Sequence, residues 1–129
     1  MRIIICGGRT YNNGELVEMV VAGLPHDTVV IEGGAKGADT LAHDAALALG
    51  MVGETFYANW TKFGKPAGRL RNQDMLDAGA DYVIAFEGHT GTAHMVHIAE
   101  QAGVPVWRPD TEAIPEDLDN AVRVHWNYA

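Results

Sequence analysis

The sequence lacks the features that define several classes of protein. Its only cysteine is Cys6, which excludes a disulfide within the chain and favours a reducing, cytoplasmic compartment. No apolar stretch approaches the roughly 20 residues of a membrane helix. The apolar run at residues 3–6 is too short for a signal peptide and meets glycines at once. We therefore expect no membrane partner.

Basic residues are also scarce. Lys and Arg together number 9, against 17 Asp and Glu, and the formal net charge is −8. Because extended nucleic acid binds to clustered Lys and Arg, this balance disfavours it as a partner. A small anionic ligand needs only a local positive site, so the net charge does not argue against one.

The rest of the composition is typical of one globular domain. A chain of 129 residues with 47% hydrophobic content is long enough for a single core and too short for two.

Residues 109–129 form a C-terminal tail, in which Pro115 is expected to start a short helix. That helix would place Leu118, Ala121, Val122 and His125 on one face, with Trp126 and Tyr128 beyond. We expect the tail to pack on the body or on a second subunit, and the latter would make a homo-oligomer.

Strand and helix patterns alternate along the chain. The strand patterns lie at residues 2–6, 29–32, 55–58, 81–87 and 104–108. Helical patterns follow Asn13 and Gly37, and two more cover residues 69–78 and 93–102, while residues 59–67 are expected to form a loop. This alternation predicts an α/β fold, a three-layer Rossmann-like domain with a mainly parallel five-stranded sheet.

Glycines follow the first, second and fourth of these strands. The pairs or near-pairs are Gly7 with Gly8, Gly33 with Gly34 and Gly37, and Gly88 with Gly91. Strand-to-helix turns of a parallel sheet share one edge, so a central first strand would bring all three turns into one crevice. Unpaired amides and the helix dipole at residues 33–37 predict an anion there, most often a phosphate. Alternatively, the glycines only permit close helix–sheet packing.

The two commonest glycine motifs do not fit. Gly33 to Gly37 reads G-G-x-x-G, which lacks the spacing of the dinucleotide fingerprint. The pair Gly64-Lys65 is followed by Pro66, where a P-loop requires Ser or Thr. The sequence therefore supports neither a usual NAD site nor an ATPase site.

The motifs nevertheless resemble a known superfamily. They are Gly33-Gly34-Ala35-Lys36-Gly37-Ala38-Asp39 with Leu41-Ala42, then Trp60…Phe63-Gly64-Lys65, Gly68-x-x-Arg71-Asn72 and Gly91-Thr92. In this order they resemble the SLOG superfamily, and within it the YspA-like branch of stand-alone domains. The resemblance implies a modified Rossmann fold that binds nucleotides or nucleotide-derived, ADP-ribose-like ligands and requires no cofactor. The superfamily includes the "Lonely guy" phosphoribohydrolases and the single-strand-binding DNA-processing protein A.

Candidate ligand-binding residues follow from the turns and from the resemblance. They are Gly7, Gly8, Arg9, Gly33, Gly34, Ala35, Lys36, Gly37, Asp39, Trp60, Arg71, Asn72, Gly88, Gly91 and Thr92. Arg9 has the forked geometry that clamps a phosphate. Asp39 either caps its helix or accepts a bond from a ribose hydroxyl. Trp60 either stacks on a base or pins its loop down.

The leading prediction is a domain that binds or senses a nucleotide-type ligand, and hydrolysis of an N-glycosidic bond is the alternative. The phosphoribohydrolases are known by P-G-G-x-G-T-x-x-E, but here Met95 stands where the final Glu would be. Asp39, Glu87 and Arg71 are the candidate catalytic residues in that case. Single-stranded nucleic acid is a third hypothesis and needs a longer basic face than this chain offers.

A metal site is disfavoured. His94 and His97 share a helical face with His89 nearby, but no carboxylate or cysteine partner accompanies them in the pattern. Cys6, at the end of an apolar run, is expected to be a small core residue.

Overall fold

The computed structural model of the chain describes residues 1–118. Its elements are β1 (Arg2–Cys6), α1 (Gly14–Ala22), β2 (Val29–Glu32), α2 (Ala38–Ala48), β3 (Val52–Thr55), α3 (Trp60–Phe63), α4 (Ala67–Asp77), β4 (Tyr82–Ala85), α5 (Thr90–Gln101) and β5 (Val106–Trp107). Strands and helices alternate as the sequence predicts, and the result is an α/β domain.

The strands form one parallel sheet in the order β3-β2-β1-β4-β5. At the centre of the sheet, Ile4 of β1 lies opposite Ile31 of β2 and Val83 of β4. The chain runs outwards from β1 to β3 and then crosses to β4, so the strand order reverses between β1 and β4. The expectation of a central first strand flanked by the second and fourth is confirmed.

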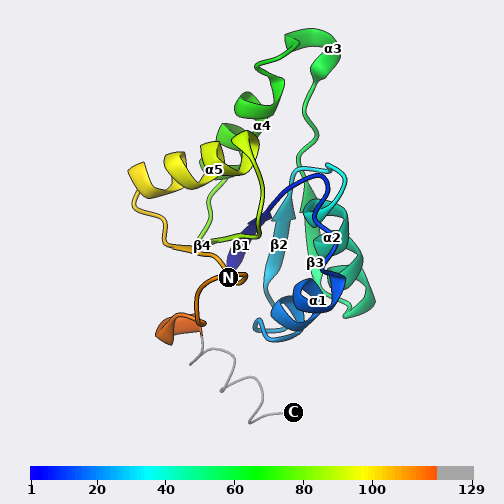
Figure 1. Cartoon of the computed structure of the whole chain (residues 1–129), viewed down its shortest axis with the longest axis vertical. Helices are drawn as coiled ribbons and strands as arrows, with labels where there is room; N and C mark the ends of the chain where they lie inside the picture. Colours follow the sequence, from blue (N-terminus) through cyan, green and yellow to red (C-terminus); the bar gives the residue numbers. More distant parts are fainter. Residues whose placement is uncertain (119–129) are drawn as a thin grey trace.

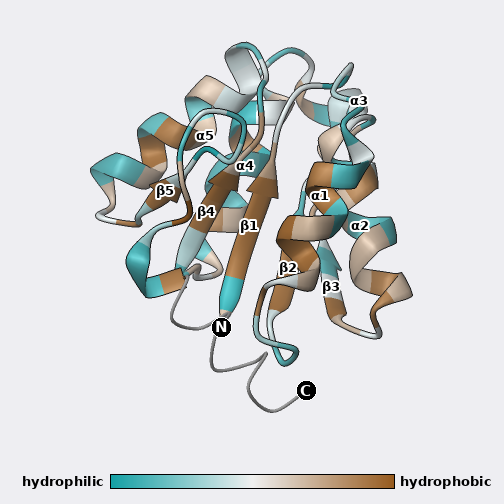
Figure 2. Ribbon diagram, turned by 60° about the horizontal axis from the view of Figure 1, so that its bottom comes forward, coloured by the Kyte–Doolittle hydropathy of each residue, from teal (hydrophilic) through white to brown (hydrophobic). Residues whose placement is uncertain are grey.

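Helices cover both faces of the sheet, and the domain therefore has three layers. Figure 1 shows α1 and α2 on one side and α4 and α5 on the other. Successive side chains of β1 point to opposite faces, as in any strand. Ile3 and Ile5 pack in the cluster with α1 and α2, whereas Ile4 and Cys6 pack in the cluster with α4 and α5. In Figure 2 the central strands are brown, which marks them as hydrophobic. Cys6 is a buried core residue, as expected.

The third strand lies earlier than the sequence predicts. β3 ends at Thr55, so the predicted strand at residues 55–58 is wrong. β3 is an edge strand that is defined by its pairing with β2, while Val52 is 61% exposed. An edge strand is defined by its backbone hydrogen bonds more than by buried side chains. The side chains of Phe56 and Tyr57 are typical of strands, and they therefore placed the predicted strand too late in the sequence.

The predicted loop at residues 59–67 contains the short helix α3. The Asn59 side chain accepts a hydrogen bond from the Lys62 amide at 3.0 Å, and Gly64 ends the helix with a φ of 64°. These local caps stabilise a single turn of helix. Figure 1 shows α3 at the far end of the segment that joins β3 to α4.

Helices α4 and α5 begin two and three residues earlier than predicted. The predicted starts were Arg69 and Ala93, whereas the helices begin at Ala67 and Thr90. Each helix has a glycine in its first turn, a residue type that is disfavoured in helix interiors and obscures the boundary in the sequence. Consequently Gly91 belongs to the first turn of α5 rather than to the turn that precedes it.

The described part of the tail packs on the body. Asp110 accepts hydrogen bonds from the Tyr11 hydroxyl and the Glu87 amide, both at 2.8 Å. Leu118 is buried in the cluster with α1 and α2 and lies in a helical turn that begins at Glu116. The other expected residues lie outside the described part of the chain: Ala121, Val122 and His125 on the helix face, and Trp126 and Tyr128 beyond. Across residues 1–118, no helix is long and apolar enough to cross a membrane.

Candidate functional site

The three glycine turns interlock at one edge of the sheet. The Gly8 amide donates to the Glu87 carbonyl at 2.8 Å, and the Ala38 amide donates to the Gly8 carbonyl at 3.2 Å. Gly37 has a φ of 78°, and a Cβ there would lie 2.2 Å from the Gly8 oxygen. Only glycine combines this conformation with so close an approach, so Gly37 serves the packing of one turn against another.

These turns border a cavity of about 380 Å³. Ten predicted site residues line it: Gly7, Gly8, Arg9, Ala35, Asp39, Trp60, Arg71, Asn72, Gly91 and Thr92. Five others do not: Gly33, Gly34, Lys36, Gly37 and Gly88. Gly88 and the catalytic candidate Glu87 line a neighbouring cavity instead. The structure therefore brings most of the predicted set together at one place.

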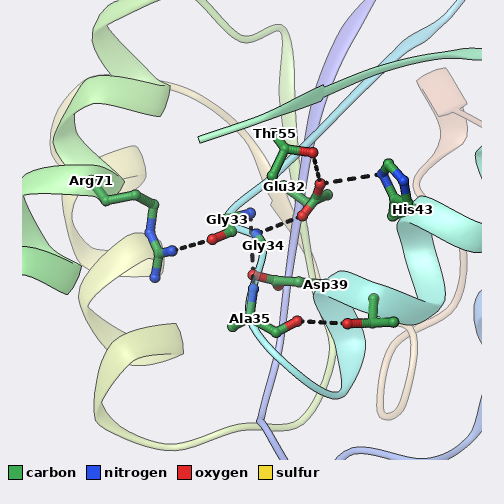
Figure 3. A network of polar contacts seen from close by, with 9 residues as sticks. Glu32, Gly33, Gly34, Ala35, Asp39, His43, Thr55 and Arg71 are labelled. Carbon is green, nitrogen blue, oxygen red and sulfur yellow. Dashed lines mark hydrogen bonds and ion pairs between the residues drawn. The ribbon is translucent and has the colours of Figure 1, made fainter. Parts of the chain in front are cut away.

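The turn between β2 and α2 is filled by its own carboxylates. The Asp39 carboxylate accepts hydrogen bonds from the amides of Gly33, at 3.1 Å, and Ala35, at 3.2 Å. The Glu32 carboxylate accepts one from the Gly34 amide at 2.6 Å (Figure 3). The expectation that these amides are unpaired is wrong, because acidic side chains within the same segment satisfy them.

Glu32 is a structural residue of this turn. Its side chain is only 2% exposed and also accepts a hydrogen bond from the Thr55 hydroxyl. The Nδ1 atom of His43 lies 3.5 Å from the carboxylate. A buried carboxylate is stable only with such partners, and Glu32 thereby ties the end of β2 to β3 and α2.

Asp39 and Arg71 both line the cavity, and their opposite charges attract each other. Burial raises the pKa of the Asp39 carboxyl from 3.8 to about 6, while its hydrogen bond from the Ala35 amide and the positive charge of Arg71 oppose this rise. Arg71 donates to the Gly33 carbonyl and, through Nε, to the Asn72 side chain at 3.1 Å. Burial lowers the pKa of Arg71, but a guanidinium stays charged at any working pH.

The first turn of α5 holds no acidic residue, whereas that of α2 holds Asp39, and no side chain caps the N-terminus of either helix. A Cβ added to Gly91 would meet nothing within 4 Å. The side-chain Nδ2 of Asn72 donates to the Gly91 carbonyl at 3.1 Å and lies 3.2 Å from Nδ1 of His94, which fixes the turn against α4. The amides of Thr90 to Thr92 have no partner within the helix, as at any helix start, and these residues line the cavity.

Positive charge gathers at this cavity. Arg9, Lys65, Arg69 and Arg71 all line it, in a chain whose net charge is −8. The Arg9 guanidinium lies 5.5 Å from the centre of the Trp60 ring, which is 47% exposed. An open helix N-terminus, several cations and an accessible aromatic ring are together suited to an aromatic anion.

Comparison with known proteins identifies the family. The family model described as "YspA, cpYpsA-related SLOG family" matches residues 1–63. The Gene 61 protein of Mycobacterium phage D29 is 37% identical over 116 residues, which cover 81% of this chain and 93% of that protein. The chain belongs to this SLOG family.

Solved structures agree on the fold. DNA processing protein A from Streptococcus pneumoniae superposes with a TM-score of 0.73 and 21% identity, covering 99% of this chain. The chain spans 56% of that protein's length. The protein TM1055 superposes with a TM-score of 0.63 and 19% identity, over 81% of this chain and 71% of that one. Both neighbours are Rossmann-like and confirm the predicted fold.

SLOG membership suggests nucleotide-related binding or processing. The structure also shows the surroundings of Met95, which aligns with the final Glu of the phosphoribohydrolase motif. Met95 is fully buried in the cluster with α4 and α5. The position that carries a Glu in the phosphoribohydrolase motif is therefore part of the apolar core here.

Sequence reasoning missed or ranked low several residues that line the cavity. They are Cys6, Thr10, Lys65, Gly68, Arg69, Met75, His89 and Thr90. Lys65 and Arg69 flank the start of α4, so an earlier helix start would have pointed to them. The predicted turn contained His89 and Thr90, whereas His89 is the residue before α5 and Thr90 is its first residue. Within residues 1–118, no three His, Cys, Asp or Glu side chains gather in a way that could hold a metal ion.

Proposed function

We propose that the protein binds a nucleotide, with its phosphate on the first turn of α5. The observation that carries this proposal is the uncapped N-terminus of α5, which opens into a cavity lined by four basic side chains. A helix N-terminus supplies directed amides and a partial positive charge. The cations add long-range attraction for an anion in an otherwise acidic protein.

The cavity also offers groups for the base and the ribose. Trp60 presents a partly exposed ring face at its border, suited to stacking on a base. The Asp39 carboxylate lines the cavity although it is only 5% exposed, and it has lone pairs left to accept from a ribose hydroxyl. Separate groups for the phosphate, the base and the ribose support binding or sensing of a nucleotide that is not hydrolysed.

N-glycosidic hydrolysis is the second candidate, and the state of Asp39 is what favours it. A carboxyl with a pKa of about 6 carries a proton at neutral pH far more often than an ordinary Asp does, which makes it better suited to protonate a departing base. Arg71 beside it would steady the charge that remains. The buried Met95 counts against this candidate, since the cavity lacks the second carboxylate of a two-carboxylate mechanism.

Calorimetric titration tests the proposal directly. AMP, ADP and GMP are titrated into the protein, with adenosine and a single-stranded oligonucleotide as comparisons. We expect the nucleotides to bind and adenosine to bind at least about tenfold more weakly, because it lacks the phosphate. Absence of heat with every nucleotide would overturn the proposal.

Two further readouts separate the alternatives. Chromatography of the same mixtures would detect a released base, and its loss in Asp39→Asn would establish hydrolysis. Tight, salt-sensitive binding of the oligonucleotide alone would instead favour the nucleic-acid hypothesis, which the DNA-processing neighbour also suggests.

A further inference from the structure

The segment that joins β3 to α4 presents exposed aromatic rings. Among residues 1–118, every exposed Phe, Trp or Tyr side chain lies in residues 57–70, here called the aromatic arm: Tyr57, Trp60 and Phe63. The Tyr57 ring lies against Gly34, where an added Cβ would come within 2.6 Å of it. The Trp60 ring lies against Gly68 in the same way, at 3.2 Å. Aromatic rings that pack on their neighbours and remain exposed are typical anchors of protein interfaces.

The aromatic arm is also basic. It carries Lys62, Lys65 and Arg69, which are all exposed, and it contains no Asp or Glu. The Nζ atom of Lys62 lies 5.0 Å from the centre of the Phe63 ring, so positive charge and apolar surface lie next to each other. In a chain with a net charge of −8, the arm is a local positive surface. It therefore suits a partner that is acidic and partly apolar.

A segment of the same chain has this complementary chemistry. Residues 110–117, here called the acidic segment, contain no Lys, Arg or His and carry four carboxylates: Asp110, Glu112, Glu116 and Asp117. Nη1 of Arg108 lies 3.7 Å from the Glu112 carboxylate and offsets one of these charges. Ala113 and Ile114 are exposed between the carboxylates. The acidic segment thus combines negative charge with apolar surface.

The arm and the acidic segment lie far apart within one chain. The arm follows β3 and the acidic segment follows β5, and these strands form the opposite edges of the sheet. Figure 1 shows α3 at the upper end of the molecule and the orange acidic segment near the lower end. The arm of one copy can therefore reach only the acidic segment of another copy. Two copies related by a two-fold axis make such a contact twice.

We propose that the protein forms a two-fold symmetric dimer in which the aromatic arm of each copy binds the acidic segment of the other. The aromatic rings pack on residues 113–115, and the basic side chains of the arm pair with the carboxylates around them. The dimer requires no nucleotide, so it stands apart from the function proposed above.

Sedimentation velocity of the full chain over a range of protein concentrations tests the dimer. We expect a monomer–dimer equilibrium whose affinity falls at least about tenfold when NaCl is raised from about 0.05 M to about 0.5 M, because salt screens the charge pairs. A chain that stays monomeric up to about 1 mM would overturn the proposal. Association that ignores salt would overturn the pairing of charges.

Charge reversal tests which surfaces meet. One variant carries Lys62→Glu and Lys65→Glu in the arm. Another carries Ala113→Lys and Glu116→Lys in the acidic segment, and all four positions are exposed. Each variant alone should be monomeric, because like charges then face each other. An equimolar mixture should form a heterodimer, since both contacts again pair opposite charges. A mixture that stays monomeric would overturn the assigned contact.

The matched control is Asp44→Lys with Ala48→Lys, at exposed positions of α2. It changes the net charge by the same amount as the variant of the acidic segment and should dimerise like the unmodified protein. Loss of the dimer in this control would attribute the association to net charge and overturn the proposal. A dimer that persists in the arm variant would place the interface elsewhere. Growth beyond two copies would overturn the two-fold arrangement.

Two measurements decide the case in which a charge variant fails to fold. The salt dependence of the unmodified chain needs no variant. Phe63→Ser removes one exposed ring and should weaken association about tenfold, and unchanged association would overturn the role of the rings. Salt-sensitive binding of a single-stranded oligonucleotide by a chain that stays monomeric would assign the arm to nucleic acid instead.

Discussion

Two glycine-containing turns at the same sheet edge, the turn before α2 and the first turn of α5, differ in whether acidic side chains occupy them. The turn before α2 has three amides bound to the carboxylates of Glu32 and Asp39, whereas the first turn of α5 holds no acidic residue. The second helical residue is Asp39 in α2 and Gly91 in α5. Glycines therefore make an anion site possible at a turn. Whether an acidic side chain in the following helix turn is present decides whether the protein's own carboxylate or a ligand can bind there.

The turn before α2, whose amides are bound by its own carboxylates (the filled turn), depends on close packing at Gly37. Gly37→Ala would force a Cβ to within 2.2 Å of the Gly8 oxygen at a φ of 78°. We expect the free energy of unfolding to fall by about 3 kcal/mol or more in urea denaturation. Gly103→Ala is the control, since its φ is 76° but its Cβ would meet nothing within 4 Å. That variant should lose only about 1 kcal/mol. Equal losses would show that contact with Gly8 is unimportant.

The next prediction converts the open turn into a filled one. Gly91→Asp places a carboxylate where α2 has Asp39, in open space and at a favourable end of the helix dipole. The fold should persist while the affinity for ADP falls about 100-fold in calorimetry, since the new anion competes with the phosphate. Gly91→Ala should stay within about threefold of the unmodified protein. Full affinity in Gly91→Asp would place the phosphate elsewhere.

The internal anion of the filled turn gives a pH dependence. The pKa of Asp39 is raised to about 6 in the folded protein, so the folded state binds this proton more tightly than the unfolded state does. Its contribution to stability is therefore complete below pH 3.8 and is lost as the pH rises through about 6. We expect a decline on the order of 1–2 kcal/mol over that interval, measured by urea denaturation.

Asp39→Asn is the control for this pH effect. The variant keeps one acceptor oxygen for the amides of Gly33 and Ala35 but has no proton to lose. Its stability should show a smaller decline between pH 4 and 6. An unchanged profile would assign the titration to another group.

Two single charge removals test whether the first turn of α5 or the turn before α2 attracts the ligand. Arg69 lines the cavity near α5, whereas Lys36 is exposed on the filled turn and does not line it. Arg69→Ala should weaken ADP binding about three- to tenfold at low salt and less at high salt. Lys36→Ala should have no measurable effect in the same titrations. The reverse order of effects would return the phosphate to the turn before α2.

Much of the fold could be predicted because its signals are local. The apolar run of β1 indicated a strand buried on both faces, and Asn13 caps α1 by accepting from the Leu16 amide at 3.2 Å. The edge strand β3 escaped prediction because its pairing partner, rather than its own side chains, defines it. The start of α5 escaped because Gly91 resembles a turn residue in the sequence.

For the candidate site, motifs in the sequence identified most of the residues, whereas the hydrogen-bond partners of those residues are known only from the folded structure. Glycines, Arg71, Asn72 and Asp39 were recognisable as motif residues, and ten of the predicted residues line one cavity. Only the structure shows that Arg71 reaches the Gly33 carbonyl across 38 positions, and that Asp39 bonds back to the amides of its own turn. The physical reason is competition for hydrogen bonds. Sequence periodicity reports which residues are buried and which backbone bends, whereas the partner of each amide depends on groups that only folding brings within 3 Å or so.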